Sequence, residues 1–375
     1  MSRFVKYILL AVALTLSQGA VAQKLTVEEL QKGLDHPWAL AFMPDGESML
    51  ITERAGQLRL WQPGKGLSQP VSGVPKVWAQ RQGGLLDVAL APDFEQSHRV
   101  WLTWTEADSE GRAGAAVGYG TLSPDSRQLT NFRVVLRQQP WLSSGANLGS
   151  RLAFDDKGYL YVTFGDNFHA ETAQDPASLT GKVIRLNADG SVPKDNPFVG
   201  KAGARSEVWT SGMRNPQGLA LNPWTHEMWE SEHGPRGGDE VNILSKGKNY
   251  GWPLATWGID YSGEKVPGSK GGRVAGTEQP AFWWKVSPAI SGMAFYNSPR
   301  FPQWKNSLFI GALKQQSLIH LKVDGSNIEE KERLLADRKE RIRDVRTGPD
   351  GYLYVLTDEN DGKLLKVGLA ESSGQ

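Results

Sequence analysis

The sequence predicts an all-β fold, a six-bladed β-propeller, and three observations point to it. The chain contains 42 glycines and 21 prolines, a composition typical of many short strands joined by tight turns. Stretches with a helical pattern of apolar residues are scarce. One pattern of strand and turn recurs six times along the chain. A recurring unit favours a ring of similar blades over two unlike domains.

Each repeat begins with a short apolar strand that runs into a turn containing Pro, Asp, Asn or Gly. The six copies begin at Leu40, Val88, Leu152, Leu219, Met293 and Val345. A second β-rich run follows each copy, and a third follows most of them. Repeats spaced unevenly by roughly 50 to 75 residues are typical of propeller blades with long loops, and a β-sandwich with coincidental turns is the alternative. Residues 24–29 are expected to supply an outer strand that closes the last blade.

The first residues predict export. Residues 1–22 have the features of a cleaved signal peptide, because Arg3 and Lys6 precede an apolar run at residues 7–16 and small residues follow it. That run is too short for a lasting membrane span, and a short N-terminal anchor is the alternative. We therefore predict a single propeller domain over residues 23–375, located in the periplasm.

The composition excludes several classes of function. The chain has no cysteine, so thiolate catalysis is excluded and stability must come from a large core. Its formal net charge is +1, and loss of the signal peptide leaves the protein close to neutral. A neutral chain has no global field for nucleic acid or anionic membranes, and no later stretch is apolar enough for membrane insertion. Any anion site must be a local cluster of cations.

The propeller geometry predicts where a ligand binds. In an antiparallel hairpin, the start of the first strand and the end of the second lie at the same edge. If the first strand of each blade lines the central channel, the polar residues at these edges converge on one mouth of the channel. These residues are Gln82, Asn147, Asp166, Asn167, Arg214, Asn215, His233, Lys314, Arg341 and Arg343.

Two arginine motifs suit a ligand with carboxylates. Arg214 and Asn215 lie on a turn stiffened by Pro216, where the guanidinium can form a fork with a carboxylate and the amide can bind a carbonyl. The alternative is an arginine that caps backbone carbonyls. Arg341 and Arg343 lie on the same side of one strand, where like charges repel unless an anion lies between them. Ordinary solvated charge is the alternative there.

The loop at residues 232–240 suits calcium. Its glycines and Pro235 expose backbone carbonyls, and Asp239 and Glu240 add hard carboxylate oxygens. A glycine-rich turn with a solvated acidic end is the alternative. The six histidines have no spacing for a zinc site on one element, and nucleophile-elbow and phosphate-loop motifs are absent from the sequence.

Six ordered motifs carry a resemblance to a known family. They lie at residues 82–86, 214–218, 232–240, 249–253, 311–314 and 341–345. Together they resemble the glucose/sorbosone dehydrogenase family, and within it the bacterial soluble PQQ-dependent aldose sugar dehydrogenases. The resemblance extends from about residue 34 to residue 367, which is nearly the whole chain after the signal peptide.

The resemblance implies that the channel mouth holds pyrroloquinoline quinone (PQQ), a planar ortho-quinone with three carboxylates. The implied cofactor-binding residues are Gln82, Arg214, Asn215, Asp239, Tyr261, Lys314, Arg341 and Arg343. Among them, Lys314 and the last two arginines would face the carboxylates, while Arg214 and Asn215 would hold the quinone oxygens. Calcium is also implied. The carbonyls of Gly234 and Pro235 would bind an ion that coordinates PQQ and acts as a Lewis acid, and Glu240 with the Tyr250 carbonyl would bind a second, structural ion.

The implied activity is oxidation of aldose sugars at C1 to lactones, with electrons passed to an external acceptor. The family uses a histidine as the base for the C1 hydroxyl, and the matching position here is Asn147. An amide orients a hydroxyl but does not accept its proton. The implied catalytic residues are therefore Asn147, Arg214 and Asp166, which matches the family's carboxylate beside the base.

Several readings of this substitution remain open. Asp166 could act as the base directly, or His169 or His233 could replace the missing histidine. The main alternative function is a non-catalytic PQQ- or sugar-binding propeller. A calcium-dependent propeller lactonase, with Glu232 and Asp239 as metal ligands, is a third, but it would have no use for the arginine and lysine cluster.

Overall fold

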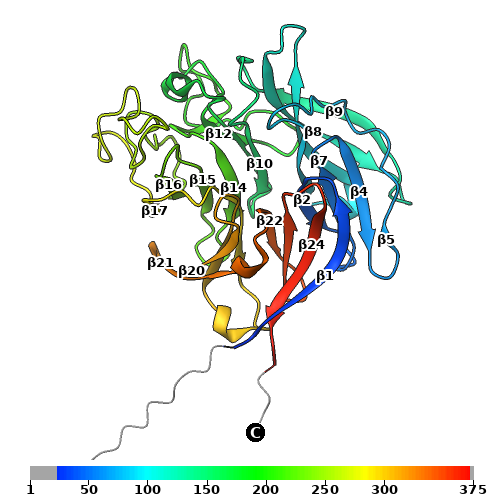
Figure 1. Ribbon diagram of the computed structural model, residues 1–375. Helices are drawn as coiled ribbons and strands as arrows, with labels where there is room; N and C mark the ends of the chain where they lie inside the picture. Colours follow the sequence, from blue (N-terminus) through cyan, green and yellow to red (C-terminus); the bar gives the residue numbers. More distant parts are fainter. Residues whose placement is uncertain (1–22, 372–375) are drawn as a thin grey trace, which may run out of the picture.

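Six four-stranded antiparallel sheets surround a central axis in the computed structural model, which describes residues 23–371 (Figure 1). The predicted six-bladed propeller is thus confirmed. The predicted signal peptide at residues 1–22 lies outside the described residues. Within the described part of the chain, no helix has the length and apolar character needed to cross a membrane.

The first three blades follow one another in chain order. Blade 1 contains β2 (Pro37–Phe42), β3 (Met49–Glu53), β4 (Gln57–Gln62) and β5 (Gly66–Leu67). Blade 2 contains β6 (Leu85–Leu90), β7 (Arg99–Ala107), β8 (Ala113–Leu122) and β9 (Leu129–Arg137), with the short helix α1 (Phe94–Ser97) between its first two strands. Blade 3 contains β10 (Gly149–Phe154), β11 (Leu160–Phe164), β12 (Lys182–Leu186) and β13 (Val208–Ser211), with the 3-10 turn η1 (Ala170–Gln174).

The last three blades complete the ring. Blade 4 contains β14 (Pro216–Leu221), β15 (Met228–Glu232), β16 (Asp239–Ile243) and β17 (Phe282–Trp284). Blade 5 contains β18 (Ile290–Tyr296), β19 (Ser307–Ala312), β20 (Ser317–Asp324) and β21 (Asn327–Leu334), with η2 (Pro302–Trp304). Blade 6 contains β22 (Ile342–Thr347), β23 (Leu353–Thr357), β24 (Gly362–Leu369) and β1 (Leu25–Leu34), and η3 (Ala336–Arg338) precedes it.

The repeated turn between the first two strands has a local cause. In blade 1, Asp45 Oδ1 accepts hydrogen bonds from the backbone N–H groups of Glu47 and Ser48, at 2.9 and 2.8 Å. Asp155 Oδ1 accepts two equivalent bonds in blade 3, from Lys157 and Tyr159. A short acidic side chain that bonds its own turn closes the hairpin without tertiary help, which is why the six repeats are visible in the sequence.

The core is divided among the interfaces between neighbouring blades. Six of the buried apolar clusters each join two adjacent blades, and the cluster between blades 1 and 2 includes Trp38, Leu50, Val100 and Trp104. Alternate side chains of a strand face opposite sides of its sheet. Each blade therefore has two apolar faces, and the ring buries both of them.

The chain ends close the ring. Strand β1 pairs antiparallel with β24, with Leu25 opposite Leu369 and Val27 opposite Val367. Figure 1 shows the two strands side by side, although they come from opposite ends of the chain. The expected outer strand at residues 24–29 is confirmed, and it extends further, to Leu34. Blade 6 is therefore held by both ends of the domain.

Charged residues fill the middle of the channel. Arg151 is 2 % exposed and lies 3.4 Å from Asp344 and 3.7 Å from Asp87. Arg346 contacts the same two carboxylates, at 3.0 and 3.1 Å. Arg151 also donates to the backbone carbonyls of Gln217 (2.6 Å) and Arg343. The network joins the inner strands of several blades and forms a floor beneath the channel mouth.

Candidate active site at the channel mouth

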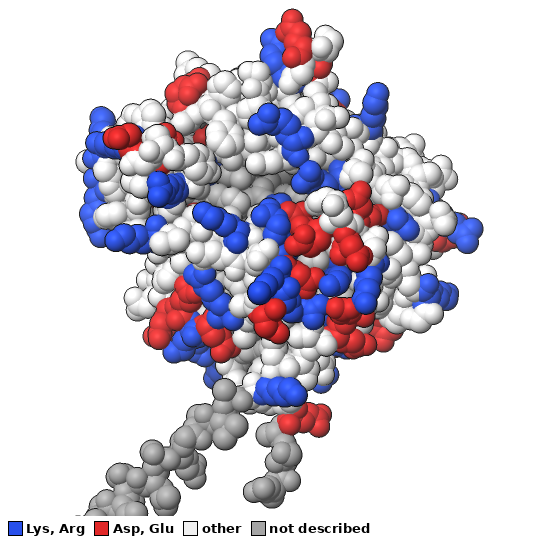
Figure 2. Space-filling model, viewed as in Figure 1, with Lys and Arg blue, Asp and Glu red and all other residues white. Residues whose placement is uncertain are grey.

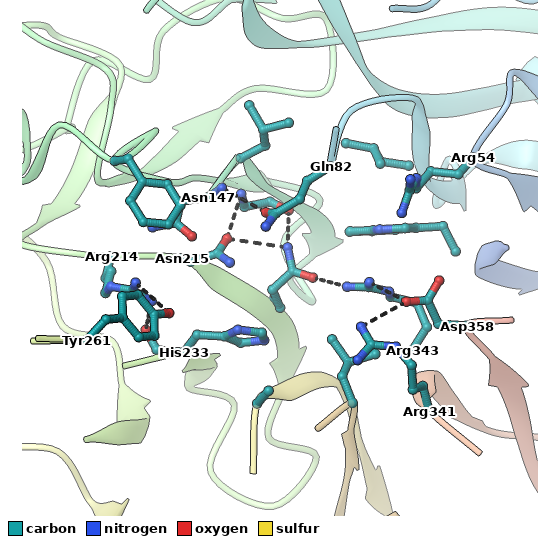
Figure 3. Close-up of a pocket in the computed structure, with 18 residues that line it drawn as sticks. Arg54, Gln82, Asn147, Arg214, Asn215, His233, Tyr261, Arg341, Arg343 and Asp358 are labelled. Carbon is teal, nitrogen blue, oxygen red and sulfur yellow. Dashed lines mark hydrogen bonds and ion pairs between the residues drawn. The ribbon is translucent and has the colours of Figure 1, made fainter. Parts of the chain in front are cut away.

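The channel mouth contains a cavity of about 200 Å³, here called the mouth pocket, to which all six blades contribute side chains (Figure 3). It is lined by Trp38, Arg54, Gln82, Leu86, Asn147, Leu148, Gly149, Phe168, Arg214, Asn215, Gln217, His233, Tyr261, Ala289, Leu313, Arg341, Arg343 and Asp358. Polar residues separated by hundreds of positions in the sequence thus meet in one small volume.

Most residues expected at the rim line this pocket. They are Gln82, Asn147, Arg214, Asn215, His233, Arg341 and Arg343, and Tyr261 joins them. Three expected residues do not line it. Asp166 lies behind Asn147. Asn167 is buried, and its amide is directed to the carbonyl of Ala113 at 3.4 Å. Lys314 lines a neighbouring hollow.

Asn147 is held from three directions. Its backbone has a φ of +52°, in the left-handed region that asparagine tolerates better than most residues. Its backbone N–H donates to Gln82 Oε1 at 2.9 Å, and its side-chain Nδ2 donates to Asp166 Oδ1 at 3.1 Å. Its carbonyl accepts a bond from the Asn167 N–H at 3.1 Å. The amide therefore faces the pocket in a fixed position.

Asp166 is a buried carboxylate with several donors. It is 1 % exposed and accepts hydrogen bonds from Trp252 Nε1 at 2.7 Å and from the Phe168 N–H at 2.9 Å, besides that from Asn147. Burial raises the pKa of Asp166, although the nearby Arg214 and these hydrogen bonds oppose the increase. The carboxylate reaches the pocket only past the Asn147 amide.

Arg214 links the pocket to the loop after β15. Its Nη1 donates to the Gly234 carbonyl at 2.9 Å, and its Nη2 lies 3.4 Å from the Tyr261 hydroxyl. Asn215 Oδ1 accepts a bond from the Gly149 N–H at 3.1 Å, which ties blade 4 to blade 3. The bond from Arg214 to the Gly234 carbonyl is of the kind that the alternative interpretation of this motif predicted, an arginine that caps backbone carbonyls.

An anion lies between Arg341, which directly precedes β22, and Arg343, which lies on that strand. It is Asp358, whose Oδ2 lies 2.9 Å from Arg343 Nη2 and 3.3 Å from Arg341 Nη2. Burial alone would raise the pKa of Asp358, but the two guanidiniums outweigh it and lower the pKa to about 2. Gln217 Oε1 also accepts a bond from Arg343 at 2.6 Å.

His233 is partly buried at the side of the pocket. Removal of the ring from solvent, together with the positive charges of Arg214 and Arg343, lowers the pKa of His233 to about 3. Its Nε2 has no hydrogen-bond partner among residues 23–371. A neutral imidazole of such low basicity is a weak proton acceptor, which disfavours His233 as a substitute base.

The pocket has an excess of positive charge. Arg54, Arg214, Arg341 and Arg343 line it, and Asp358 is the one acidic side chain among the lining residues. Figure 2 shows the hollow on this face with Lys and Arg side chains beside it. Such a cluster in a protein of near-zero net charge is suited to an anion.

Trp38, Arg54, Gln217 and Asp358 are among the lining residues that the sequence did not single out. Arg54 and Asp358 directly follow the second strands β3 and β23, so the rule that located the other rim residues applies to them as well. Trp38 lies on the inner strand β2, and Gln217 lies on the inner strand β14. Whether such a side chain points into the channel depends on the pleat of its strand, which the sequence did not reveal.

Comparisons with known proteins agree with this architecture. A family model described as Glucose / Sorbosone dehydrogenase matches residues 34–366. The aldose sugar dehydrogenase YliI of Escherichia coli (strain K12) is 62% identical over 348 residues, which cover 93% of this chain and 94% of that protein. The chain belongs to the glucose/sorbosone dehydrogenase family.

Solved structures of family members superpose closely. The soluble aldose sugar dehydrogenase of Escherichia coli in its apo-form has a TM-score of 0.92 and 62% identity, covering 92% of this chain and 100% of that one. The PQQ-bound aldose sugar dehydrogenase of Streptomyces coelicolor has a TM-score of 0.73 and 26% identity, covering 92% and 99%. The fold that this chain shares with the two solved structures therefore extends over 92% of its length.

Three of the four residues expected to bind calcium line one small cavity in blade 4, while Pro235 lines the hollow that also contains Lys314. Glu240 and Tyr250 line a small cavity of about 10 Å³, to which Gly234 also contributes. Burial and the charge of neighbouring Glu232 raise the pKa of both Glu230 and Glu240. Within residues 23–371 no three His, Cys, Asp or Glu side chains converge on a metal position. An ion here would need backbone carbonyls as well.

Among the residues expected to bind the cofactor, Asp239 and Lys314 lie outside the mouth pocket. Asp239 is fully buried and accepts bonds from the N–H groups of Gly234 (3.0 Å) and Ile290 (3.2 Å), so it shapes the loop after β15. Lys314 lines an adjoining hollow of about 630 Å³, here called the side hollow. The side hollow is lined by Pro235, Arg236, Gly237, Trp257, Ile259, Tyr261, Lys285, Val286, Ser287 and Lys314. Tyr261 is common to both cavities.

Proposed function

We propose that this protein oxidises aldose sugars at C1 to lactones, with PQQ bound in the mouth pocket and electrons passed to an external acceptor. Its family and a relative named aldose sugar dehydrogenase at 62% identity support the reaction. The observation that carries the cofactor assignment is the excess of four arginines over one aspartate in the mouth pocket. Two buried nitrogen atoms of the pocket, His233 Nε2 and Arg343 Nε, also have no hydrogen-bond partner within the described residues 23–371. A ligand with three carboxylates is complementary to such a site.

The residues present fit PQQ. Arg341 and Arg343, with Lys314 at the border of the side hollow, would bind its carboxylates, while Arg214 and Asn215 would hold its quinone oxygens. When bound, PQQ supplies the acceptor for the hydride that leaves C1 of the sugar. Gln82 contributes indirectly, because its Oε1 fixes the backbone of Asn147.

Calcium is part of the proposal. The carbonyls of Gly234 and Pro235 would bind one ion next to PQQ, and Glu240 with the Tyr250 carbonyl would bind a second. The buried Glu230 Oε1 and Asn242 Oδ1, which have no hydrogen-bond partner among residues 23–371, support a cation in this region. Since the Gly234 carbonyl accepts a bond from Arg214 in this structure, the first ion requires that guanidinium to turn toward the cofactor.

The proton of the C1 hydroxyl needs an acceptor. Asn147 would orient this hydroxyl through its amide but does not accept the proton. Asp166 is the carboxylate directly behind it, and its raised pKa makes it a better base than a solvated aspartate. We infer that Asp166 accepts the proton when the Asn147 amide turns aside, so turnover is slow relative to a site with histidine.

A second candidate function follows from the same residue. If Asp166 stays hydrogen-bonded to Asn147, the protein binds PQQ and sugar without efficient turnover. One experiment separates the two functions. The apo-protein is mixed with PQQ and calcium, PQQ binding is followed by its absorbance, and dye reduction is followed with a panel of aldoses for wild type, Asn147→His and Asp166→Asn.

The outcomes are distinct. Wild-type turnover that Asp166→Asn abolishes would support the dehydrogenase with Asp166 as its base. Binding of PQQ by wild type with turnover in Asn147→His alone would support the binding protein. Failure of all three proteins to bind PQQ would remove the cofactor assignment.

We also infer that the protein works in the periplasm. The sequence of residues 1–22, with its positive start and short apolar run, supports export. The size of the mature protein after expression in a bacterial host, measured by mass spectrometry of a periplasmic extract, tests this. A mature chain that still begins at Met1 would contradict it.

A further inference from the structure

The side hollow opens directly beside the mouth pocket. The Tyr261 ring separates the two cavities and is 61 % exposed, while its hydroxyl lies 3.4 Å from Arg214 Nη2. A ligand whose reacting end occupies the mouth pocket can therefore continue past this ring into the side hollow. At about 630 Å³, the side hollow has the size of an ordinary small-molecule site.

The walls of the side hollow are fixed by backbone pairing and ring stacking. Arg236 and Ile259 form an antiparallel bridge, with N–H···O distances of 3.0 and 3.2 Å in the two directions. Trp257 stacks on Trp283 with ring centroids 4.8 Å apart and an interplanar angle of 7°. A side chain at Gly272 would collide with the Trp257 ring at 2.5 Å, so the backbone there closely covers it. The hollow is therefore formed before any ligand binds.

Its surface is unusually apolar for exposed residues. Eight large apolar side chains are exposed within residues 23–371, and Ile259, Tyr261 and Val286 all line this hollow. Val286 is 65 % exposed. Exposed apolar groups that gather beside an active site mark a binding surface. A flat tyrosine ring next to aliphatic side chains suits the C–H face of a sugar ring.

The same hollow carries cations without partners. Arg236 and Lys285 form no ion pair within the described part of the chain, and no acidic side chain lines the hollow. Asp260 and Glu264 lie on the neighbouring loop and are exposed or partly exposed, outside the lining. Residues 244–281, which include part of the lining, contain five Lys or Arg and three Asp or Glu. A bound group in this hollow would meet positive charge.

We propose that the side hollow binds the second ring of a reducing disaccharide and that Arg236 and Lys285 recognise a carboxylate on that ring. The inference rests on the proposed oxidation of aldoses, because the reducing ring must lie in the mouth pocket. Tyr261, Ile259 and Val286 would contact the apolar face of the second ring. The protein would then prefer acidic disaccharides, of the glucuronosyl-glucose type, over neutral ones of the same linkage.

The preference is measured on the protein reconstituted with PQQ and calcium. The substrates are glucose, a neutral glucosyl-glucose and the glucuronosyl-glucose of the same linkage, and kcat/KM is compared at low and high salt. We expect the acidic disaccharide to exceed the neutral one by about tenfold at low salt, since two partly exposed charge pairs contribute modestly and are screened by salt. The double variant Arg236→Gln/Lys285→Gln should lose this preference and oxidise glucose as before.

A matched control removes the same charge elsewhere. Lys65→Gln/Lys157→Gln changes two lysines on blades 1 and 3 that form no ion pair in residues 23–371, and this variant should keep the preference. Calorimetric titration of both disaccharides into the same reconstituted proteins measures the preference without turnover. Equal affinity of wild type for the two disaccharides, or a preference that survives the Arg236 and Lys285 changes, would overturn the proposal. Tight binding of the acidic disaccharide without oxidation of any aldose would support the side hollow and contradict the proposed function instead.

Discussion

The side-chain amide of Asn147 donates a hydrogen bond to Asp166 Oδ1 across 3.1 Å, where Asn147 lines the mouth pocket and Asp166 does not. Asn147 is 4 % exposed and Asp166 is 1 % exposed. The amide therefore both satisfies the carboxylate and blocks its route to a substrate hydroxyl. This one pair determines how fast the proposed reaction can run.

The first prediction concerns that pair. Asn147→His should raise kcat for glucose by about a hundredfold or more, because an imidazole held by Asp166 is a general base and an amide is not. The measurement is the initial rate of dye reduction with saturating PQQ and calcium. Asn147→Gln, which keeps an amide, should bring no gain. Equal rates for wild type and Asn147→His would contradict the role assigned to this position.

The second prediction concerns cofactor affinity. Arg341→Gln should weaken PQQ binding by about tenfold, because one charge-assisted contact to a carboxylate is lost. The Arg341 side chain is 42% exposed, so the fold should tolerate the change. The dissociation constant is measured by titration of apo-protein with PQQ. Arg112→Gln, on the exposed hairpin of blade 2, removes the same charge and should leave the affinity for PQQ unchanged. An equal loss of PQQ affinity in both variants would indicate a general effect of net charge and contradict the prediction.

The third prediction concerns calcium. Addition of calcium to chelator-treated protein should raise its melting temperature, because an ion that binds only the folded state stabilises it. Glu240→Gln should reduce this increase, since the variant loses a hard, charged ligand. Differential scanning calorimetry with and without excess chelator provides the readout, and Glu227→Gln on the surface of the same blade is the control. A melting temperature that calcium does not change would remove the structural ion from the proposal.

The fourth prediction follows from the lowered pKa of Asp358. Its folded-state pKa of about 2 lies below its ordinary value of 3.8, so the folded protein holds the proton more weakly than the unfolded chain. The resulting stabilisation is complete above pH 3.8 and is lost as the pH falls toward 2. It amounts to about 2 kcal/mol.

Urea unfolding of wild type and Asp358→Asn at several pH values measures this. The variant should be less stable by about 3 kcal/mol near neutral pH, because the buried Arg343 guanidinium and the partly exposed Arg341 guanidinium lose their anion. The gap should narrow as the pH falls below 3.8. A gap that stays constant with pH would show that Asp358 does not stabilise the fold through its charge. Asp324→Asn, at the exposed end of β20, is the control.

Much of the fold is local in origin and was predictable. The six hairpins follow from turn residues such as Asp45 and Asp155, which bond their own turns. Even the closing strand at residues 24–29 was predicted correctly, because a ring of blades needs a last partner for β24. We expected residues next to the strand ends of each blade's first hairpin to meet at the channel mouth. This expectation located Arg214 and Arg341 correctly, because these strand ends repeat in register around a propeller.

Other parts of the site were not predictable from local pattern. The anion between Arg341 and Arg343 is Asp358, which belongs to the next strand-end of the same blade. Lys314 comes shortly after the end of β19, as expected for the channel mouth, yet it lines the side hollow. The backbone N–H groups of Lys314 and Gln315 both donate to the Pro288 carbonyl, a contact outside their own hairpin that the local sequence does not reveal. The export signal and the individual ligand roles stay predictions.

By itself the sequence determined the number of blades, the family and the cationic character of the mouth, since these depend on short repeats and on residue types at fixed positions. Only the tertiary structure decided which charges neutralise one another and which remain free. Asp358 partly neutralises two arginines, whereas Arg236 and Lys285 have no ion-pair partner in residues 23–371. The physical reason is that charge pairing depends on distances of a few ångströms between residues that are not neighbours in the sequence, and local sequence does not encode those distances.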